Sequence, residues 1–220
     1  MNLFDDDQKQ WLSLIDEAGE VCILPNCFSE EESQLYFSQI YNEIAWAEET
    51  IMMFGKPVTV PRLVAWYGDP QVNYQYSGLE HTPLPWLPVL NNIRLTIMRE
   101  INRYFNLPVT FNSVLCNLYR NGHDAMGWHS DNEAELGTDP FIASVSFGTT
   151  RFFDIKLKNR PRHENQQQRF ALEKGALLVM KGPFQRNWLH QVPKQKKVLE
   201  PRINLTFRYV KPSNNASNPH

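Results

Sequence analysis

The chain contains 220 residues, of which 42% are hydrophobic and 21% charged, and its net charge is −2 at pH 7. This composition predicts one globular domain with extensions and excludes a global cationic field, so any polyanion has to be bound by a local basic patch. Cys22, Cys27 and Cys116 cannot form a closed set of disulfides, which favours reduced thiols and a cytoplasmic location, or a nuclear one in a eukaryote. We find no signal peptide and no apolar run near the roughly 18 residues of a membrane span, so we expect no membrane association.

The N-terminal part of the chain predicts two helices separated by a strand. Residues 5–18 have an amphipathic pattern that Gly19 would end, and residues 21–24 are a short apolar run typical of a strand. Ser29 and Glu32 have the spacing of a capping box, which predicts that a helix begins there. The apolar residues after it recur at helical spacing, which predicts packing against a sheet.

A hairpin and a long helix are expected next. Residues 46–67 have the pattern of strand, turn and strand, and their tip carries two methionines and a phenylalanine that either fold back on the core or contact a partner. Residues 69–86 are rich in loop-forming residues, and their tyrosines could stack on nucleobases or anchor the loop itself. From Trp86 to Phe105, apolar residues recur at steps of three and four, which predicts a helix with one buried face.

The C-terminal half has the pattern of short strands without intervening helices, which predicts an antiparallel sandwich or barrel. Strand-like runs cover residues 111–119, 141–147, 151–157, 176–181 and 202–210. Basic residues cluster in the expected loop 156–165 and again at Lys194, Lys196 and Lys197, where they are either solvated or bind phosphates. The polar tail from Ser213 predicts disorder.

A possible metal site follows from the His-Ser-Asp motif at the end of the stretch 117–131. Residues two apart on an extended segment point the same way, so His129 and Asp131 can offer an imidazole nitrogen and a carboxylate oxygen to one metal ion. His190 is the best third ligand. Two histidines and one carboxylate leave three coordination positions open, which suits non-haem Fe(II) with a co-substrate and dioxygen. Zinc hydrolases also use such a donor set, but the sequence has no H-E-x-x-H motif.

A second polar group is predicted beside this site. Polar and apolar side chains alternate along residues 202–208, which places Arg202, Asn204, Thr206 and Arg208 on one strand face. Asn117 and Tyr119 precede the His-Ser-Asp motif on another strand-like run. Two arginines with a tyrosine and an asparagine suit a dicarboxylic acid, because arginine binds a carboxylate bidentately.

The order N-x-Y, H-x-D, distal histidine and R-x-N-L-T-F-R resembles the AlkB family of Fe(II)- and 2-oxoglutarate-dependent dioxygenases, most closely the members that repair alkylated double-stranded DNA. The resemblance covers about residues 61–209. It implies an α+β fold, namely a double-stranded β-helix (jelly roll) with N-terminal helices and a β-hairpin substrate-recognition lid. It also implies N-terminal helices and a finger hairpin in residues 1–60, a dioxygenase domain in 61–211 and a disordered tail in 212–220.

The resemblance further implies the ligands of the site. Fe(II) would be bound by His129, Asp131 and His190, which form the catalytic centre, and dioxygen would take the last open position. The co-substrate 2-oxoglutarate would be held by Asn117, Tyr119, Arg202, Asn204 and Arg208, with Arg202 clamping one carboxylate.

The expected substrate is DNA alkylated on a base nitrogen, as in 1-methyladenine and 3-methylcytosine. The base would leave the stack and be demethylated oxidatively, with release of formaldehyde, succinate and carbon dioxide. Phe54 would wedge into the duplex, Tyr76 would stack on the base, and Glu133 would contact its polar edge and favour cationic bases. The full set expected to contact substrate is Phe54, Arg62, Tyr74, Tyr76, Ser77 and Glu133.

Two other functions remain open from the sequence. The same chemistry could act on RNA, such as tRNA, or on a protein side chain. The tip at Met53, Phe54 and Gly55 discriminates between these substrates and duplex DNA, since a wedge is useful on a duplex and of little use on single strands. A jelly-roll module that binds without turnover is the third reading, although the three ligands and both arginines are present. We expect the protein to be a monomer.

Overall fold

The computed structural model describes residues 9–53, 55–72, 74–76, 79–160 and 167–211. In chain order the elements are β1 (Leu12–Ile15), β2 (Glu20–Leu24), α1 (Glu30–Glu43), β3 (Ala47–Met53), β4 (Lys56–Gly68), β5 (Tyr74–Tyr76), β6 (Leu79–His81), α2 (Pro88–Phe105), β7 (Ser113–Tyr119), β8 (Met126–His129), η1 (Ala134–Leu136), β9 (Ile142–Gly148), β10 (Arg151–Leu157), β11 (Gln168–Leu172), β12 (Leu177–Lys181), α3 (Phe184–Asn187), β13 (Trp188–Val192) and β14 (Arg202–Arg208).

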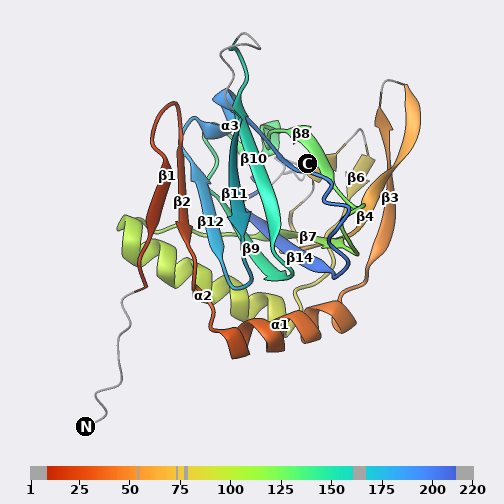
Figure 1. Cartoon of the computed structure of the whole chain (residues 1–220), viewed down its shortest axis with the longest axis horizontal. Helices are drawn as coiled ribbons and strands as arrows, with labels where there is room; N and C mark the ends of the chain where they lie inside the picture. Colours follow the sequence, from red (N-terminus) through yellow and green to blue (C-terminus); the bar gives the residue numbers. More distant parts are fainter. Residues whose placement is uncertain (1–8, 54, 73, 77–78, 161–166, 212–220) are drawn as a thin grey trace, which may run out of the picture.

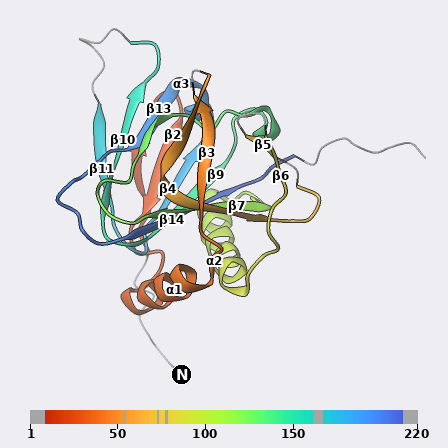
Figure 2. The same cartoon turned by 90° about the vertical axis from the view of Figure 1, so that its right-hand side faces the viewer.

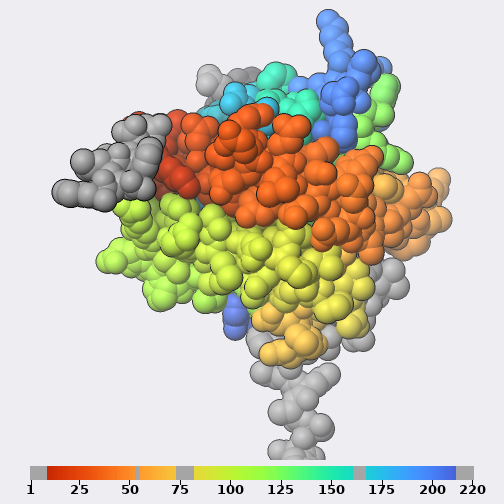
Figure 3. Space-filling view, turned by 90° about the horizontal axis from the view of Figure 1, so that it is seen from below, coloured from red at the N-terminus to blue at the C-terminus, as the bar shows by residue number. Residues whose placement is uncertain are grey.

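The strands form a large and a small antiparallel sheet, with helices outside the large one (Figure 1). The large sheet has the order β1-β2-β12-β9-β14-β7-β4-β3, the small sheet the order β11-β10-β13-β8, and β5 pairs with β6. Figure 3 shows α1 and α2 side by side across the outer face. This arrangement confirms the predicted double-stranded β-helix.

Two hydrophobic clusters fill the spaces between these layers. Between the helices and the large sheet, Ile97 of α2 packs with residues such as Val114 and Leu205, all fully buried. Between the two sheets, Ile142 and Leu178 of the large sheet pack with Ile155 of the small sheet. The large sheet is therefore covered on both faces by apolar side chains, and the polar site lies toward one end of the space between the sheets.

Helix α1 begins where the sequence predicts, and α2 begins two residues after the predicted start at Trp86. The Ser29 hydroxyl accepts the backbone N–H of Glu32, and the Glu32 carboxylate accepts the N–H of Ser29, so the predicted capping box is present. Pro88 occupies the first turn of α2, where its missing N–H is not needed. The helix ends at Asn106, whose left-handed backbone conformation stops the helical hydrogen-bonding pattern.

The helix predicted for residues 5–18 is wrong over the part that the structure describes. Residues Leu12–Ile15 form strand β1, which pairs with β2 at Leu12↔Ile23 and Ser13↔Cys22. The turn between the strands uses positive φ angles at Ala18 and Gly19. Gly19 therefore closes a hairpin and not a helix, because pairing with the neighbouring strand outweighs the weak helical preference of a short segment.

Strands from both sides of the expected boundary at 60/61 belong to one sheet. This boundary lies inside β4, and β2 near the N-terminus pairs with β12 of the C-terminal half. The hairpin of β3 and β4 extends the large sheet at one edge and lies nearest the viewer in Figure 2. The structure adds β8, β11 and β13, which had no separate strand prediction, and the loop expected at 156–165 begins only after β10. No helix within the described ranges is long and apolar enough to cross a membrane.

We predict that Gly122→Ala destabilises the fold. A Cβ atom at this glycine would lie 1.8 Å from the carbonyl oxygen of Gln195, and the two segments are joined by backbone hydrogen bonds, so the backbone has to move. Overpacking of this kind costs about 1–3 kcal/mol, which lowers the melting temperature by roughly 2–12 °C. Calorimetry would measure the change. Gly127→Ala is the matched control, because nothing lies within 4 Å of its Cβ position. Equal melting temperatures for the two variants would contradict the packing argument.

Candidate metal centre and anion pocket

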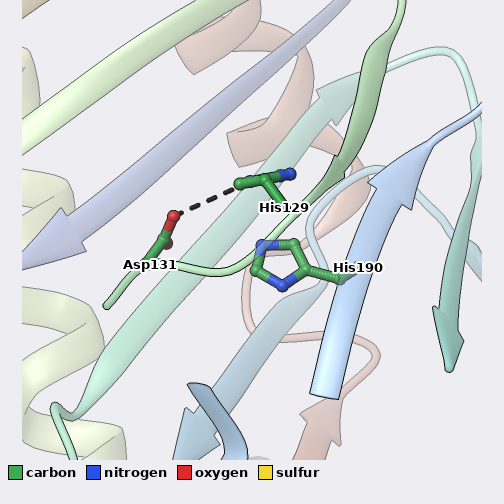
Figure 4. A group of neighbouring side chains, drawn as sticks. All are labelled: His129, Asp131 and His190. Carbon is green, nitrogen blue, oxygen red and sulfur yellow. Dashed lines mark ion pairs between the residues drawn. The ribbon is translucent and has the colours of Figure 1, made fainter. Parts of the chain in front are cut away.

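The predicted metal ligands come together through the pairing of β13 with β8. The register places His190 directly opposite His129, and their rings lie 4.1 Å apart. Asp131 follows two residues after the end of β8. One ligand atom from each residue lies within 4.8 Å of the others, and Figure 4 shows the three side chains converging.

Charge in this cluster is balanced from the opposite sheet. Burial raises the pKa of the Asp131 carboxyl, but Arg208 of β14, His190 and His129 lower it more, so the pKa lies below its usual range. Arg208 Nη2 donates to Asp131 Oδ2 at 2.8 Å. Burial, with the neighbouring His129, lowers the pKa of His190 to about 3. At neutral pH the cluster therefore offers an ionised carboxylate and a neutral imidazole, the forms that bind metal ions.

Hydrogen bonding also orients the imidazole of His129. The Nδ1 atom of His129 lies 2.9 Å from the carbonyl oxygen of Gly127, while Nε2 faces Asp131 at 3.7 Å. A bond from Nδ1–H to a carbonyl leaves the lone pair on Nε2, which is how metal-binding histidines are commonly oriented. The donor set of two imidazoles and one carboxylate fits Fe(II).

The polar residues predicted beside the metal ligands share one pocket because of strand register. β14 pairs with β7 so that Arg202 lies opposite Tyr119 and Asn204 opposite Asn117. All four side chains are buried. The two-residue spacing in N-x-Y and in R-x-N therefore places both pairs on the inner face of the large sheet.

Arg202 is a buried cation whose hydrogen-bonding capacity is only partly used. Its side chain is 1% exposed, and Nη2 donates to Ser146 Oγ at 2.9 Å. Its Nε and Nη1 atoms have no hydrogen-bond partner among the described residues. Burial lowers the pKa of Arg202 to about 10, so the group is still charged at neutral pH. A buried guanidinium with two unsatisfied donors is a site for a carboxylate.

A second buried arginine nearby has a different function. Arg151 donates to the carbonyl oxygens of Asn121, Asp124 and Pro193 and to the side chain of Gln195. These bonds join the segment before β8 to the segment after β13. The guanidinium of Arg151 is thus occupied by bonds within the protein, whereas Arg202 has two unsatisfied donors that can bind an anion.

A cleft of about 520 Å³ opens beside the metal ligands. One wall comes from the β3–β4 hairpin, including Glu48 and Arg62, and the other includes His129 and Glu133. The pairing of β3 with β4 is irregular between Thr59 and Leu63. This bulge accompanies the turn of Arg62 into the cleft, where Arg62 Nε donates to Asn117 Oδ1 at 2.7 Å.

Glu133 lines this cleft four residues after His129. Its Oε2 atom is buried and has no hydrogen-bond partner among the described residues. A carboxylate oxygen in that situation is stabilised by a donor from a bound molecule, since an unsatisfied buried acceptor costs about 1–3 kcal/mol or more. The contact with a base that the sequence predicts for Glu133 stays a prediction.

The structure describes the other predicted substrate residues only in part. Phe54 and Ser77 lie outside the described residues. Tyr74 and Tyr76 lie in β5, but their side chains are not described. Their proposed contacts with a base stay predictions.

Sequence reasoning missed four supporting residues. Ser144 and Ser146 of β9 bind Asn204 and Arg202, and their alternation with buried apolar residues was the available signal. Arg151 and Gln185, both 1% exposed, had no such signal, because their partners are backbone groups distant in sequence.

Comparisons with known proteins agree with this geometry. The model of the 2OG-Fe(II) oxygenase superfamily matches residues 20–208. Alpha-ketoglutarate-dependent dioxygenase alkB homolog 3 of Bos taurus is 40% identical over 200 residues, which cover 88% of this chain and 67% of the relative. DNA oxidative demethylase ALKBH2 of Mus musculus is 39% identical over 202 residues, with coverage of 89% and 82%. The solved structure of OsALKBH1 has a TM-score of 0.61 at 17% identity, over 86% of this chain and 96% of that one, and supports the fold alone.

We predict that Asp131→Asn strongly weakens metal binding. The amide has the same shape but lacks the negative charge, so the loss should exceed the roughly 10- to 100-fold typical of an outer-shell change. Calorimetric titration with Mn²⁺ would measure the affinity. Asp154→Asn is the control, because Asp154 is equally buried but pairs with Arg169 in the small sheet. Wild-type affinity in the Asp131 variant would remove it from the ligand set.

We also predict that Arg202→Lys weakens binding of 2-oxoglutarate by roughly 10- to 100-fold. An ammonium group cannot make the two-pronged contact, and a hydrogen bond to a charged group contributes about 1.5–3 kcal/mol. The dissociation constant can be measured by calorimetry with Mn²⁺ present. Arg169→Lys, which alters a bidentate pair with Asp154 elsewhere, should leave it unchanged. An unchanged constant in the Arg202 variant would shift the clamp to Arg208.

Proposed function

Because the chain belongs to the AlkB family of the 2OG-Fe(II) oxygenase superfamily, we propose that it is an oxidative demethylase that repairs N-alkylated bases in DNA. The observation that carries this proposal is the convergence of two histidines, one carboxylate and an incompletely satisfied buried arginine beside a deep cleft. The printed name of the mouse relative, a DNA oxidative demethylase, supports DNA as the substrate.

Fe(II) would be held by His129, Asp131 and His190. With 2-oxoglutarate and dioxygen also bound, the iron would supply the oxidation that removes an N-methyl group as formaldehyde, with release of succinate and carbon dioxide. Arg208 keeps Asp131 ionised and in place through its hydrogen bond. The protein thereby contributes binding, orientation and charge balance.

The 2-oxoglutarate pocket would be formed by Arg202 with Tyr119, Asn117 and Asn204. Arg202 can donate two hydrogen bonds to one carboxylate. The ring of Tyr119 faces the guanidinium of Arg202, with 5.3 Å between Arg202 Cζ and the ring centroid. The buried serines of β9 orient Arg202 and Asn204 from behind. An anion of matching length relieves the cost of the unsatisfied guanidinium, which favours a dicarboxylate over a neutral ligand.

The cleft between the hairpin and the metal ligands would hold a base that has left the helical stack. Glu133 lies on the wall that also carries His129, and its unpartnered oxygen can accept a hydrogen bond from an exocyclic amino group. Its negative charge favours bases that methylation has made cationic, namely 1-methyladenine and 3-methylcytosine. Arg62 borders both the cleft and the pocket through its bond to Asn117.

RNA and protein side chains are the alternative substrates of the same chemistry, and binding without turnover is the third possibility. Mass spectrometry would separate them after incubation of the protein with Fe(II), 2-oxoglutarate and methylated single- and double-stranded DNA and RNA. We expect formaldehyde and repaired bases from DNA. Repair of RNA alone would overturn the DNA assignment, and succinate formation without any repair would point to a protein substrate. The monomeric state and the cytoplasmic location stay predictions.

Glu133→Gln provides a sharper test of lesion choice. The amide keeps the size of the side chain but loses its charge, so repair of cationic 1-methyladenine should fall roughly 10- to 100-fold, the equivalent of about 1.5–3 kcal/mol. Repair of neutral 1-methylguanine should change much less. Paired initial rates on the same oligonucleotide sequence measure this selectivity, with Glu135→Gln in the adjacent η1 helix as the control. A uniform loss on both bases would mean that Glu133 does not read charge.

A further inference from the structure

Asp131 is the one proposed metal ligand that lies outside a strand. β8 ends at His129, so the backbone N–H of Asp131 has no partner in the sheet. It donates instead to the side-chain carbonyl oxygen of Gln185, at 2.9 Å. The backbone at this ligand is therefore held by a side chain that comes from a segment more than fifty residues later.

Gln185 is itself fixed by packing. It lies in the one-turn helix α3, between β12 and β13, and is 1% exposed. Its neighbour Phe184 is fully buried and stacks on Trp188 at 6.0 Å between ring centroids. A Cβ atom at Gly19 would lie 2.4 Å from the Cα of Phe184, which shows how closely the N-terminal hairpin covers α3. The amide of Gln185 thus has a defined position before any ligand binds.

Lys158 connects Gln185 to the same turn a second time. Its Nζ atom donates to the backbone carbonyl oxygen of Gln185 at 2.7 Å and to Ser130 Oγ at 2.9 Å. Gln185 therefore holds Asp131 directly and holds Ser130 through Lys158. Because Gln185 lies three residues before the start of β13, the strand that carries His190, it relates the two halves of the metal site.

The bonding of Gln185 indicates why the residue is polar. Its Nε2 atom donates to Met180 Sδ at 3.5 Å, which is a weak acceptor, so the main contribution of the amide is the bond to Asp131. Gln185 does not line the cleft beside the metal ligands. An apolar side chain would fill the same space between Met180 and Phe184 but would leave the N–H of Asp131 buried and unsatisfied.

We propose that Gln185, assisted by Lys158, is a positioning residue that sets Asp131 in the geometry needed to bind the metal ion. The inference rests on the proposed role of Asp131 as a metal ligand. Partners of this kind, which orient a ligand without touching the metal, typically contribute 10- to 100-fold to metal affinity.

The test compares Gln185→Met with the matched variant Gln191→Met. Both remove a buried or half-buried amide next to the site, but Gln191 donates to Asp154 on the other side of β13. Calorimetric titration with Mn²⁺, in the absence of 2-oxoglutarate, should give a dissociation constant that is 10- to 100-fold higher for Gln185→Met and equal to the wild-type value for Gln191→Met. Melting temperatures of the metal-free proteins give the structural effect separately.

Equal metal affinities for Gln185→Met and the wild type, or equal losses in both glutamine variants, would overturn the proposal. If Gln185→Met does not fold, Lys158→Met replaces it and should weaken Mn²⁺ binding in the same direction, with Lys158→Arg restoring part of the loss. No Mn²⁺ binding by the wild-type protein would instead contradict the proposed function. Binding that is lost in Asp131→Asn but unchanged in both the Gln185 and Lys158 variants would contradict only the positioning role.

Discussion

The pairing of β13 with β8 is the constraint on which the metal site depends. It sets His190 opposite His129, and no other contact in the described structure joins the two histidines through the backbone. The remaining ligand, Asp131, lies beyond the end of β8 and is held by contacts outside this strand pair. Arg208 from the large sheet binds its carboxylate, and Gln185 binds its backbone N–H. The site is thus assembled from both sheets and is sensitive to how they pack.

Two buried charges, the carboxylate of Asp131 and the guanidinium of Arg202, determine the electrostatics of this region. Asp131 stays ionised inside the protein mainly because the guanidinium of Arg208 pairs with its carboxylate. Arg202 is buried with an incomplete set of partners, which is unfavourable for stability until an anion arrives. Such an arrangement sacrifices some stability of the ligand-free protein for a preformed pocket, a common property of binding sites.

The hairpin of β3 and β4 connects the cleft to the polar pocket around Arg202. It continues the large sheet at its edge and runs away from α1 (Figure 1). The irregular pairing around Pro61 turns Arg62 inward to Asn117, and the carbonyl oxygen of Pro61 accepts the N–H of Ala125 just before β8. One bulge therefore connects the cleft wall, the anion pocket and the strand that ends in His129.

The sequence by itself determined the features that are local or periodic. The capping box and the face of β14 that carries Arg202 follow from rules of one helix turn or of alternation along a strand. Only the tertiary structure decided the rest. Residues 12–15 became a strand because β2 offered a partner, and Gln185 became a support for Asp131 because α3 is packed against the small sheet. Such contacts join residues far apart in the chain, and no local pattern encodes which buried side chain will meet which backbone group.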